Sequence, residues 1–402
     1  MNYIEGIRVK NYRVLRDISL GSILSENRPG DVSLKVPTFG KRLTPLTVVI
    51  GRNGYGKSTL FDAFGFIVDC LKGDVEHACA TRGGFDKIVS KDCERVLEFQ
   101  VRYGNILYSL YIAADDYNVP FVDHESLTHV EPNYWDRDTM NFFVKNGEGK
   151  VIRPNSSEVV TEIKLADHRR LALATLGNLT QYPEIVAFRQ FLDSWYLCCF
   201  SPDAARKTPA IGSQRHLSSS GDNIANVVHY MEREHPIRFQ QTIERVISRI
   251  LGITKISTVQ TEDGRLLTQF YEKESPHPFY ASQMSDGTLK LIAYMMLLDD
   301  PFPPPFVCIE EPENGLYHKL LQVFIDEIRR HTNDKCGSQF FITTHQPYLV
   351  DALHPDEVWI LDKGDDGYAS IRLASDDSIV HEMVQSGHPL GALWYSDYLD
   401  HY

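Results

Sequence analysis

The stretch that decides the fold runs Leu46-Thr47-Val48-Val49-Ile50-Gly51-Arg52-Asn53-Gly54-Tyr55-Gly56-Lys57-Ser58-Thr59. Its second part has the spacing G-x-x-x-x-G-K-[ST], which is typical of a phosphate-binding loop. The five residues before the loop are apolar and mostly β-branched, as expected for a buried parallel strand. After the loop, apolar residues recur every three to four positions, which predicts a helix with one apolar face; they are Leu60, Phe61, Phe64, Ile67, Val68 and Leu71. Strand, loop and helix in this order indicate an α/β fold.

Each residue type in the loop suits a nucleoside triphosphate. Glycines let backbone N–H groups curl around phosphates without a Cβ in the way. Lys57 can reach the β- and γ-phosphates, the Ser58 hydroxyl can bind Mg²⁺, and the following helix directs its positive end at the same anion. The alternative, a glycine-rich turn with an incidental lysine, is disfavoured by the strand–loop–helix context. The predicted ATP-binding residues here are Gly51, Arg52, Asn53, Gly54, Tyr55, Gly56, Lys57, Ser58 and Thr59.

Two adjacent carboxylates follow a second apolar strand, predicted over Phe306 to Ile309. The carboxyl ends of parallel strands form the ligand edge of an α/β sheet. Glu310 can hold the Mg²⁺ hydration shell, and Glu311 can orient and deprotonate an attacking water. The alternative is a solvated acidic turn. Two adjacent acids in a chain that also has a phosphate loop favour the catalytic interpretation.

A third apolar strand ends in Thr343-Thr344-His345. A histidine at this place can hydrogen-bond a γ-phosphate or the attacking water and so respond to the nucleotide state. The alternative is a capping histidine before a turn. Upstream, Ser285, Asp286 and Gly287 open a strongly apolar helix, and free N–H groups with a serine hydroxyl could clamp a γ-phosphate. An ordinary helix cap explains the same residues equally well.

Taken in order, these four segments resemble the ATP-binding-cassette ATPases, and they look closest to the RecF/SMC/OLD-like stand-alone prokaryotic branch. Ser285-Asp286-Gly287-Thr288 is similar to the cassette signature, and Glu310-Glu311-Pro312-Glu313-Asn314-Gly315-Leu316 to a Walker B and D-loop segment. Thr343-Thr344-His345 resembles the switch-histidine loop. The fold that this resemblance implies is an ABC-ATPase head domain: a P-loop parallel sheet, an antiparallel β subdomain and an inserted helical lobe, without a long coiled coil.

The resemblance also implies a head-to-tail homodimer, with higher oligomers left open, that sandwiches two ATP molecules. Each site would take Lys57, Ser58, Glu310, Glu311 and His345 from one subunit, and Ser285 and Gly287 from the other. A γ-phosphate that bridges two surfaces favours the dimer only while it is present, so hydrolysis would loosen the dimer.

This sequence departs from the family pattern in several places. The Walker B acid is Glu310 in place of the usual aspartate, and Tyr317 stands where a D-loop aspartate is expected. A Q-loop glutamine is not evident, and its expected location is the loop from Phe200 to Arg206. No Toprim-type nuclease segment follows His345. The apolar tail from Leu390 to Tyr395 is expected to dock on a partner or on the chain's own core.

Composition limits the kinds of partner. The chain has 402 residues and a net charge of −13, so it has no global basic field for nucleic acid. Seven cysteines without a C-x-x-C pair fit a reducing compartment. The sequence shows no signal peptide and no apolar run of about 18 residues. We therefore expect a cytoplasmic protein without membrane contact, and the Asn155-Ser156-Ser157 glycosylation pattern should be irrelevant.

Four segments are predicted along the chain. Residues 1–115 form the N-terminal half of the ATPase core, 116–215 a variable β and helical insertion, 216–280 a helical lobe with a hairpin, and 281–402 the C-terminal half. Residues 22–45 should be a loop, and 158–194 and 222–251 mainly helical. Turns are expected at Gly104-Asn105, Asn146-Gly147 and Glu262-Asp263-Gly264, and a helix start at Pro236.

Two functions remain open at this stage. The first is a DNA-associated ATPase whose local basic patches contact DNA; each patch could equally be a solvated face, and the candidates are Lys41-Arg42, His168-Arg169-Arg170, Arg206-Lys207 and Arg215. The second is an ATP-gated scaffold for a separately encoded effector such as a nuclease, as in relatives that look like parts of anti-phage or toxin–antitoxin modules. A transporter cassette and a P-loop kinase fit the motifs less well.

Overall fold

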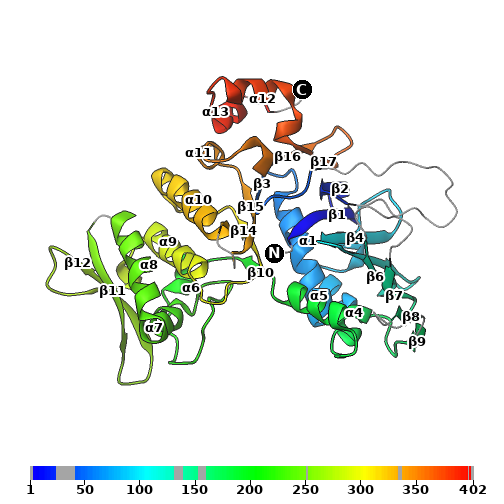
Figure 1. Ribbon diagram of the computed structural model, residues 1–402, viewed down its shortest axis with the longest axis horizontal. Coiled ribbons are helices and arrows are strands. Elements are labelled where there is room, and N and C mark those ends of the chain that lie inside the picture. Colours follow the sequence, from blue (N-terminus) through cyan, green and yellow to red (C-terminus); the bar gives the residue numbers. More distant parts are fainter. Residues whose placement is uncertain are drawn as a thin grey trace. The chain divides into compact units, whose positions relative to one another are not determined.

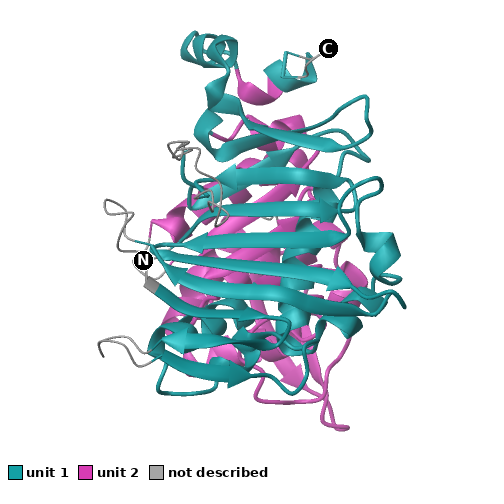
Figure 2. Ribbon diagram, turned by 90° about the vertical axis from the view of Figure 1, so that its right-hand side faces the viewer, with its two compact units in different colours: residues 1–195, 354–388, 393–402 teal, residues 196–353, 389–392 magenta. Residues whose placement is uncertain are grey.

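The computed structural model describes residues 3–23, 41–130, 139–152, 160–249, 252–333, 337–396 and 398–399. Two compact units share the chain: unit 1 holds residues 1–195, 354–388 and 393–402, and unit 2 holds 196–353 and 389–392 (Figure 2). Most of the loop predicted over 22–45, the glycosylation pattern at Asn155 and one of the cysteines, Cys336, lie outside the described residues. Each unit is described by itself.

Unit 1 contains an eight-stranded antiparallel sheet in the order β2-β1-β4-β5-β6-β7-β8-β9. Its strands are β1 (Ile4–Tyr12), β2 (Leu15–Gly21), β4 (Val96–Tyr103), β5 (Ile106–Ala114), β6 (Pro120–His129), β7 (Thr139–Lys145), β8 (Glu148–Ile152) and β9 (Val160–Lys164). The predicted turns at Gly104 and at Asn146-Gly147 are confirmed, with positive φ at all three residues. The short β–β connections explain why neighbouring strands in the sequence pair so regularly.

The phosphate loop of unit 1 lies between β3 (Leu46–Ile50), which is buried throughout, and α1 (Lys57–Lys72). β3 pairs in parallel with β16 (Val358–Lys363), which pairs antiparallel with β17 (Ala369–Leu373). The predicted apolar face of α1 is buried. The other helices of this unit are α2 (Val75–Ala80), α3 (Phe85–Ile88), α4 (Ala172–Leu176), α5 (Pro183–Asp193) and α12 (Ser378–Gln385).

The sequence prediction for residues 158–194 is wrong at its start. Residues 160–164 form strand β9, which pairs with β8, and helix begins only at Ala172. The local sequence Val160-Thr161-Glu162-Ile163-Lys164 alternates apolar and polar residues and carries β-branched side chains, which favours a strand.

Unit 2 has a parallel core of β10 (Tyr196–Cys198), β14 (Phe306–Glu310) and β15 (Gln339–Thr344). Its helices are α6 (Pro202–Ala205), α7 (Ile224–Glu234), α8 (Pro236–Arg249), α9 (Asp286–Leu298), α10 (His318–Thr332) and α11 (Pro347–Val350). A small antiparallel sheet is formed by β11 (Ile253–Gln260), β12 (Leu266–Glu272) and β13 (Phe279–Tyr280), and α7 and α8 pack on it (Figure 1). The predicted helix start at Pro236 and the hairpin at Glu262-Asp263-Gly264 are both confirmed.

The predicted fold class is confirmed as α/β, with a P-loop strand–helix unit, an antiparallel sheet and a helical lobe. Across the residues that the structure describes, the longest helix is the 16-residue α1, so none forms a long coiled coil. Within the same residues, no helix is both long and apolar enough to cross a membrane. The tail forms α13 (Leu390–Tyr395), and its Leu390, Leu393 and Trp394 side chains are buried, which agrees with docking on the chain itself.

Candidate functional site

The phosphate loop of unit 1 is shaped by two glycines with positive φ. Gly54 has φ 81° and Gly56 has φ 111°, conformations that residues with a Cβ rarely adopt. A Cβ on Gly56 would lie 2.8 Å from Val14 Cγ2, and one on Gly51 would lie 2.5 Å from the Leu361 carbonyl oxygen. Both Gly51 and Gly56 are therefore required by close packing within unit 1.

Lys57 begins α1 and lies inside the loop. Its side chain is buried, and Nζ donates to the carbonyl oxygens of Gly51 at 2.8 Å and Arg52 at 3.3 Å. Ser58 is exposed at the first turn of α1, where no side chain of the described residues caps the helix start. A loop of backbone N–H groups, a lysine and a serine at a helix start is the donor set that a triphosphate with Mg²⁺ needs.

The carboxylates of unit 2 follow directly from the end of β14. Glu310 is the last residue of the strand and pairs with Thr343 of β15. Glu311 has φ 43°, a left-handed backbone conformation that is costly for a residue with a side chain. Its N–H donates to the Thr343 carbonyl oxygen at 2.9 Å. Backbone strain at the predicted general base is a feature that recurs at functional sites.

His345 faces these carboxylates from the end of β15. Its Nδ1 lies 3.1 Å from Glu311 Oε1 and 3.3 Å from Glu313 Oε1. Because an ionised carboxylate only accepts hydrogen bonds, Nδ1 carries the proton and Nε2 is the ring nitrogen left for another partner. The structure thus brings together two of the residues that the sequence singled out, Glu311 and His345.

Glu313 is a site residue that the sequence analysis missed. It is buried, and its Oε1 accepts from Thr344 Oγ1 at 2.7 Å and from the His345 N–H at 2.9 Å. These bonds tie the turn after β14 to the end of β15. Taken by itself, the local sequence Glu311-Pro312-Glu313 is typical of a solvated acidic turn. One indication of its role is present in the sequence. A neighbouring strand ends in Thr-Thr-His, and the polar groups at that strand end need a hydrogen-bond acceptor such as the Glu313 carboxylate.

The D-loop segment is held by two further contacts. Asn314 Nδ2 donates to Glu311 Oε2 at 3.0 Å, and Lys290 of α9 donates to the Asn314 carbonyl oxygen at 2.8 Å. Lys290 is buried, and this desolvation lowers the pKa of its ammonium group. Tyr317, at the position where the resemblance implies an aspartate, is exposed, and its ring lies 4.2 Å from the His318 ring at a tilt of 55°.

The signature segment opens α9 as an N-cap. Ser285 Oγ accepts from the Thr288 N–H at 3.2 Å. This hydrogen bond is the one that an ordinary N-cap residue makes. A Cβ on Gly287 would lie 2.7 Å from the Gly315 carbonyl oxygen, so the signature and D-loop backbones are in close contact. Arg206, at the end of the predicted Q-loop region, donates to the Met284 carbonyl oxygen at 3.0 Å and also bonds Asp286.

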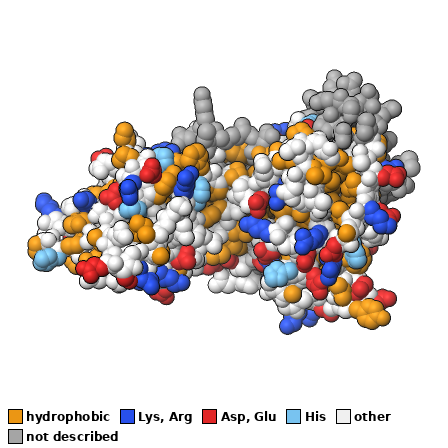
Figure 3. All heavy atoms as spheres, turned by 90° about the horizontal axis from the view of Figure 1, so that it is seen from below, with side chains coloured by type: hydrophobic (Ala, Val, Ile, Leu, Met, Phe, Trp, Pro, Cys, Tyr) orange, Lys and Arg blue, Asp and Glu red, His pale blue; other side chains and the backbone are white. Residues whose placement is uncertain are grey.

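The predicted basic patches are mostly neutralised by neighbouring acids. Lys41 pairs with Asp356 at 3.0 Å and Arg42 with Glu5 at 2.8 Å. Arg169 pairs with both Asp167 and Glu76, and Arg206 pairs with Asp203 and Asp286. On the face drawn in Figure 3, basic and acidic side chains are intermingled. These contacts weaken three of the four patches as DNA sites, whereas Arg215 has no ion-pair partner within the described residues.

Many solved structures match this chain, and two of them are long but distant matches. The first is the crystal structure of an Smc head bound to the C-terminal winged-helix domain of ScpA, with 15% identity, a TM-score of 0.48, and coverage of 92% of this chain and 97% of that one. The second is an Smc head with an extended coiled coil, bound to the C-terminal domain of ScpA from Pyrococcus furiosus. That match has 14% identity, a TM-score of 0.47, and coverage of 96% and 100%.

Sequence comparison is more specific. No curated protein matches the chain. A family model described as "AAA domain, putative AbiEii toxin, Type IV TA system" matches residues 112–351, a range that contains the signature, the carboxylates and His345 and leaves out the phosphate loop. Since this match spans more than half of the chain, the protein belongs to that family of AAA-domain proteins.

Proposed function

We propose that this chain binds ATP with Mg²⁺ and hydrolyses it to ADP and phosphate. The observation that carries the proposal is the His345 imidazole held 3.1 Å from the Glu311 carboxylate, at the carboxyl ends of parallel strands. The complete phosphate loop of unit 1 supports the same conclusion. Membership of an AAA-domain family is consistent with it.

The residues have distinct roles in this proposal. The loop N–H groups and Lys57 would bind the phosphates, and Ser58 and Glu310 would hold Mg²⁺, which would supply charge neutralisation at the phosphate oxygens. Glu311 orients the attacking water and accepts its proton. His345 presents Nε2 as an acceptor to that water or, as the doubly protonated imidazolium, as a donor to the γ-phosphate. No cluster of three or more candidate metal ligands occurs among the described residues.

Two variants test the proposal directly. Lys57→Ala should abolish ATP binding, measured by titration calorimetry. Glu311→Gln should retain ATP binding and lose about 100-fold or more in turnover, because a general base is worth about that much. Glu262→Gln, at the exposed β11–β12 turn, is the matched control and should hydrolyse ATP like the parent chain. Normal turnover in Glu311→Gln contradicts the assignment of the base.

We further propose a nucleotide-dependent homodimer in which Ser285 and Gly287 of one subunit meet the nucleotide of the other. Glu311→Gln should dimerise with ATP in light scattering, since a bridging γ-phosphate persists when hydrolysis is blocked. Ser285→Arg should still bind ATP and remain monomeric. An ATP-dependent dimer in the Ser285→Arg variant argues against a role for Ser285 across the interface.

ATP turnover in this chain is proposed to gate another activity, with a separately encoded effector favoured over DNA. The toxin–antitoxin wording of the family description and the neutralised basic patches support the effector. Tagged Glu311→Gln protein, purified from its host with ATP and Mg²⁺ and treated with nuclease, should retain a protein partner. Loss of every partner on digestion, together with DNA-stimulated turnover of the lone protein, supports a DNA-directed ATPase instead.

A further inference from the structure

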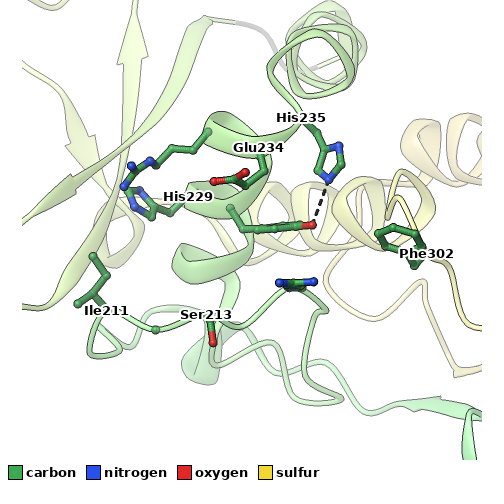
Figure 4. Close-up of a pocket in the computed structure, with 10 residues that line it drawn as sticks. Ile211, Ser213, His229, Glu234, His235 and Phe302 are labelled. Atoms are coloured by element: carbon green, nitrogen blue, oxygen red, sulfur yellow. Dashed lines mark hydrogen bonds between the residues drawn. The ribbon is translucent and has the colours of Figure 1, made fainter.

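Unit 2 contains two adjoining clefts away from the carboxylates. The first, of about 660 Å³, is bordered by the loop before α7, by α7 and by Phe302 in the loop after α9 (Figure 4). The second, of about 530 Å³, continues over the start of α8. Both are lined by Glu234 and His235, so together they form one groove, here called the α7–α8 groove.

The groove carries an excess of positive charge, with three arginines beside one acid that has no ion-pair partner among the described residues, Glu234. Arg215, Arg233 and Arg238 line it, and within the described residues none of the three has an ion-pair partner. This contrasts with Arg245 and Arg330 on the same wall, which pair with Asp299 and Glu327. The helix dipole accounts for Arg233 in the last turn of α7 but not for Arg238, which lies in the first turn of α8, where a cation is disfavoured.

Aromatic and apolar groups share the groove with these arginines. The Arg215 guanidinium lies 5.8 Å from the Tyr230 ring centroid, and the Tyr230 hydroxyl bonds His235 Nε2 at 3.0 Å (Figure 4). Phe302 is 65% exposed at the rim, and Ile237, 78% exposed, lies on the second cleft. Planar rings and guanidinium groups that face one opening are the surfaces on which nucleobases stack.

We propose that the α7–α8 groove binds a nucleotide unit, with its phosphate on Arg233 and Arg238 and its base against Phe302 and Tyr230. This site shares no residue with the phosphate loop and does not depend on the proposed ATP hydrolysis. The nucleotide unit can be free or part of a single strand, since both offer an aromatic base and a phosphate. An acidic peptide would use the arginines but not the ring faces.

Binding to the full chain carrying Lys57→Ala, which removes the proposed ATP site, tests the inference. Probes are a fluorescein-labelled 15-mer of deoxythymidylate, AMP, inorganic phosphate and polyglutamate, measured by anisotropy or by competition at 50 mM and 200 mM salt. Phe302→Ala should weaken binding of the nucleotide probe about tenfold, the usual loss for one stacked base. Arg233→Glu and Arg238→Glu should each weaken it at least as much and lower its salt dependence.

Lys273→Glu is the matched charge reversal, because Lys273 is exposed in unit 2 outside the groove. It should leave binding within twofold of the parent. Equal affinity for AMP and the 15-mer identifies a free nucleotide as the ligand, and preference for the 15-mer identifies a single strand. Absence of nucleotide binding, tighter binding of polyglutamate, or equal losses in Lys273→Glu and Arg238→Glu each overturn the proposal. Thermal unfolding of every variant checks that the fold is retained.

Discussion

His345 Nδ1 lies 3.1 Å from Glu311 Oε1, and this contact joins the end of β15 to the strained turn after β14. The ring nitrogen used by the carboxylate is unavailable to a nucleotide, so any contact of His345 with a phosphate or a water is made through Nε2. A change in the hydrogen bond made by Nε2 therefore affects the contact of Nδ1 with Glu311, because both nitrogens belong to the same imidazole ring. This coupling gives the site a route by which the state of the nucleotide affects the proposed base.

Glu313 is predicted to act as a positioning residue for His345. Glu313→Ala removes the acceptor of Thr344 Oγ1, which is fully buried, and of the His345 N–H. Turnover should fall about 10-fold to 100-fold, because His345 and Glu311 lose their alignment. The dissociation constant for ATP should stay within about threefold, since Lys57 and its loop are untouched. Steady-state kinetics and titration calorimetry separate the two quantities.

The conservative variant controls for a merely structural loss. Glu313→Gln keeps one amide oxygen as the acceptor for Thr344 and His345, so it should recover most of the turnover lost in Glu313→Ala. Parent-like turnover in Glu313→Ala, or an equal loss of turnover in both variants, contradicts the positioning role.

Gly56 is predicted to tolerate no side chain. Gly56→Ala places a methyl group 2.8 Å from Val14 Cγ2 at φ 111°, so both sterics and backbone conformation oppose it. We expect a loss of more than about 2 kcal/mol in the free energy of unfolding. Gly54→Ala is the control, because its φ is also positive while no atom lies within 4 Å of the added Cβ. It should cost only about 1 kcal/mol, and equal losses in urea unfolding contradict the packing argument.

The sequence predicts those parts of the site that local chemistry decides. The apolar run before Gly51 and the Gly-Lys-Ser spacing lead to β3, the loop and α1 without tertiary information. The apolar runs that end at Glu310 and His345 predict strands β14 and β15 in the same way. Local sequence does not decide the roles of Glu313 and Arg206, because each depends on a partner from another segment that the fold brings to it, Thr344 for Glu313 and Met284 for Arg206. Residues 160–164 show the opposite case, where a local alternation was present and was outweighed by the expectation of a helix.

Glu125 is predicted to make the stability of unit 1 depend on pH. It is fully buried in β6, and it accepts from Tyr108 Oη at 3.0 Å and from the N–H groups of Ala172 and Leu173 that begin α4. Burial raises the pKa of its carboxyl from 4.5 to about 7, although these hydrogen bonds oppose the shift. Between these two pKa values the folded protein retains a proton that the unfolded chain has lost.

The sign of the effect follows from this difference in bound protons. The contribution of Glu125 is most favourable below pH 4.5 and declines as the pH rises toward about 7. Over that window the decline is about 3 kcal/mol. Glu125→Gln should lower stability by a constant amount and abolish this part of the slope, measured by urea unfolding from pH 5 to pH 8. Glu148→Gln, on an exposed side chain, should keep the parent slope. An unchanged slope in Glu125→Gln contradicts the assignment.

Asp299 is predicted to be the most costly charge to remove from unit 2. It is buried at the end of α9, accepts from Thr242 Oγ1 of α8 at 2.8 Å, and pairs with Arg330 of α10 at 3.3 Å and with Arg245. Asp299→Asn leaves the arginines beside a single remaining acid, Glu327. The free energy of unfolding should fall by about 3 kcal/mol, as for other buried pairs that lose one partner.

Asp263→Asn breaks the exposed pair with Arg265 and should cost less than about 1 kcal/mol. Urea unfolding at 0.1 M and 1 M NaCl distinguishes the two, because salt screens the exposed pair more strongly than the pairs of the buried Asp299. A loss in Asp299→Asn no larger than that in Asp263→Asn would show that this network does not hold the three helices together.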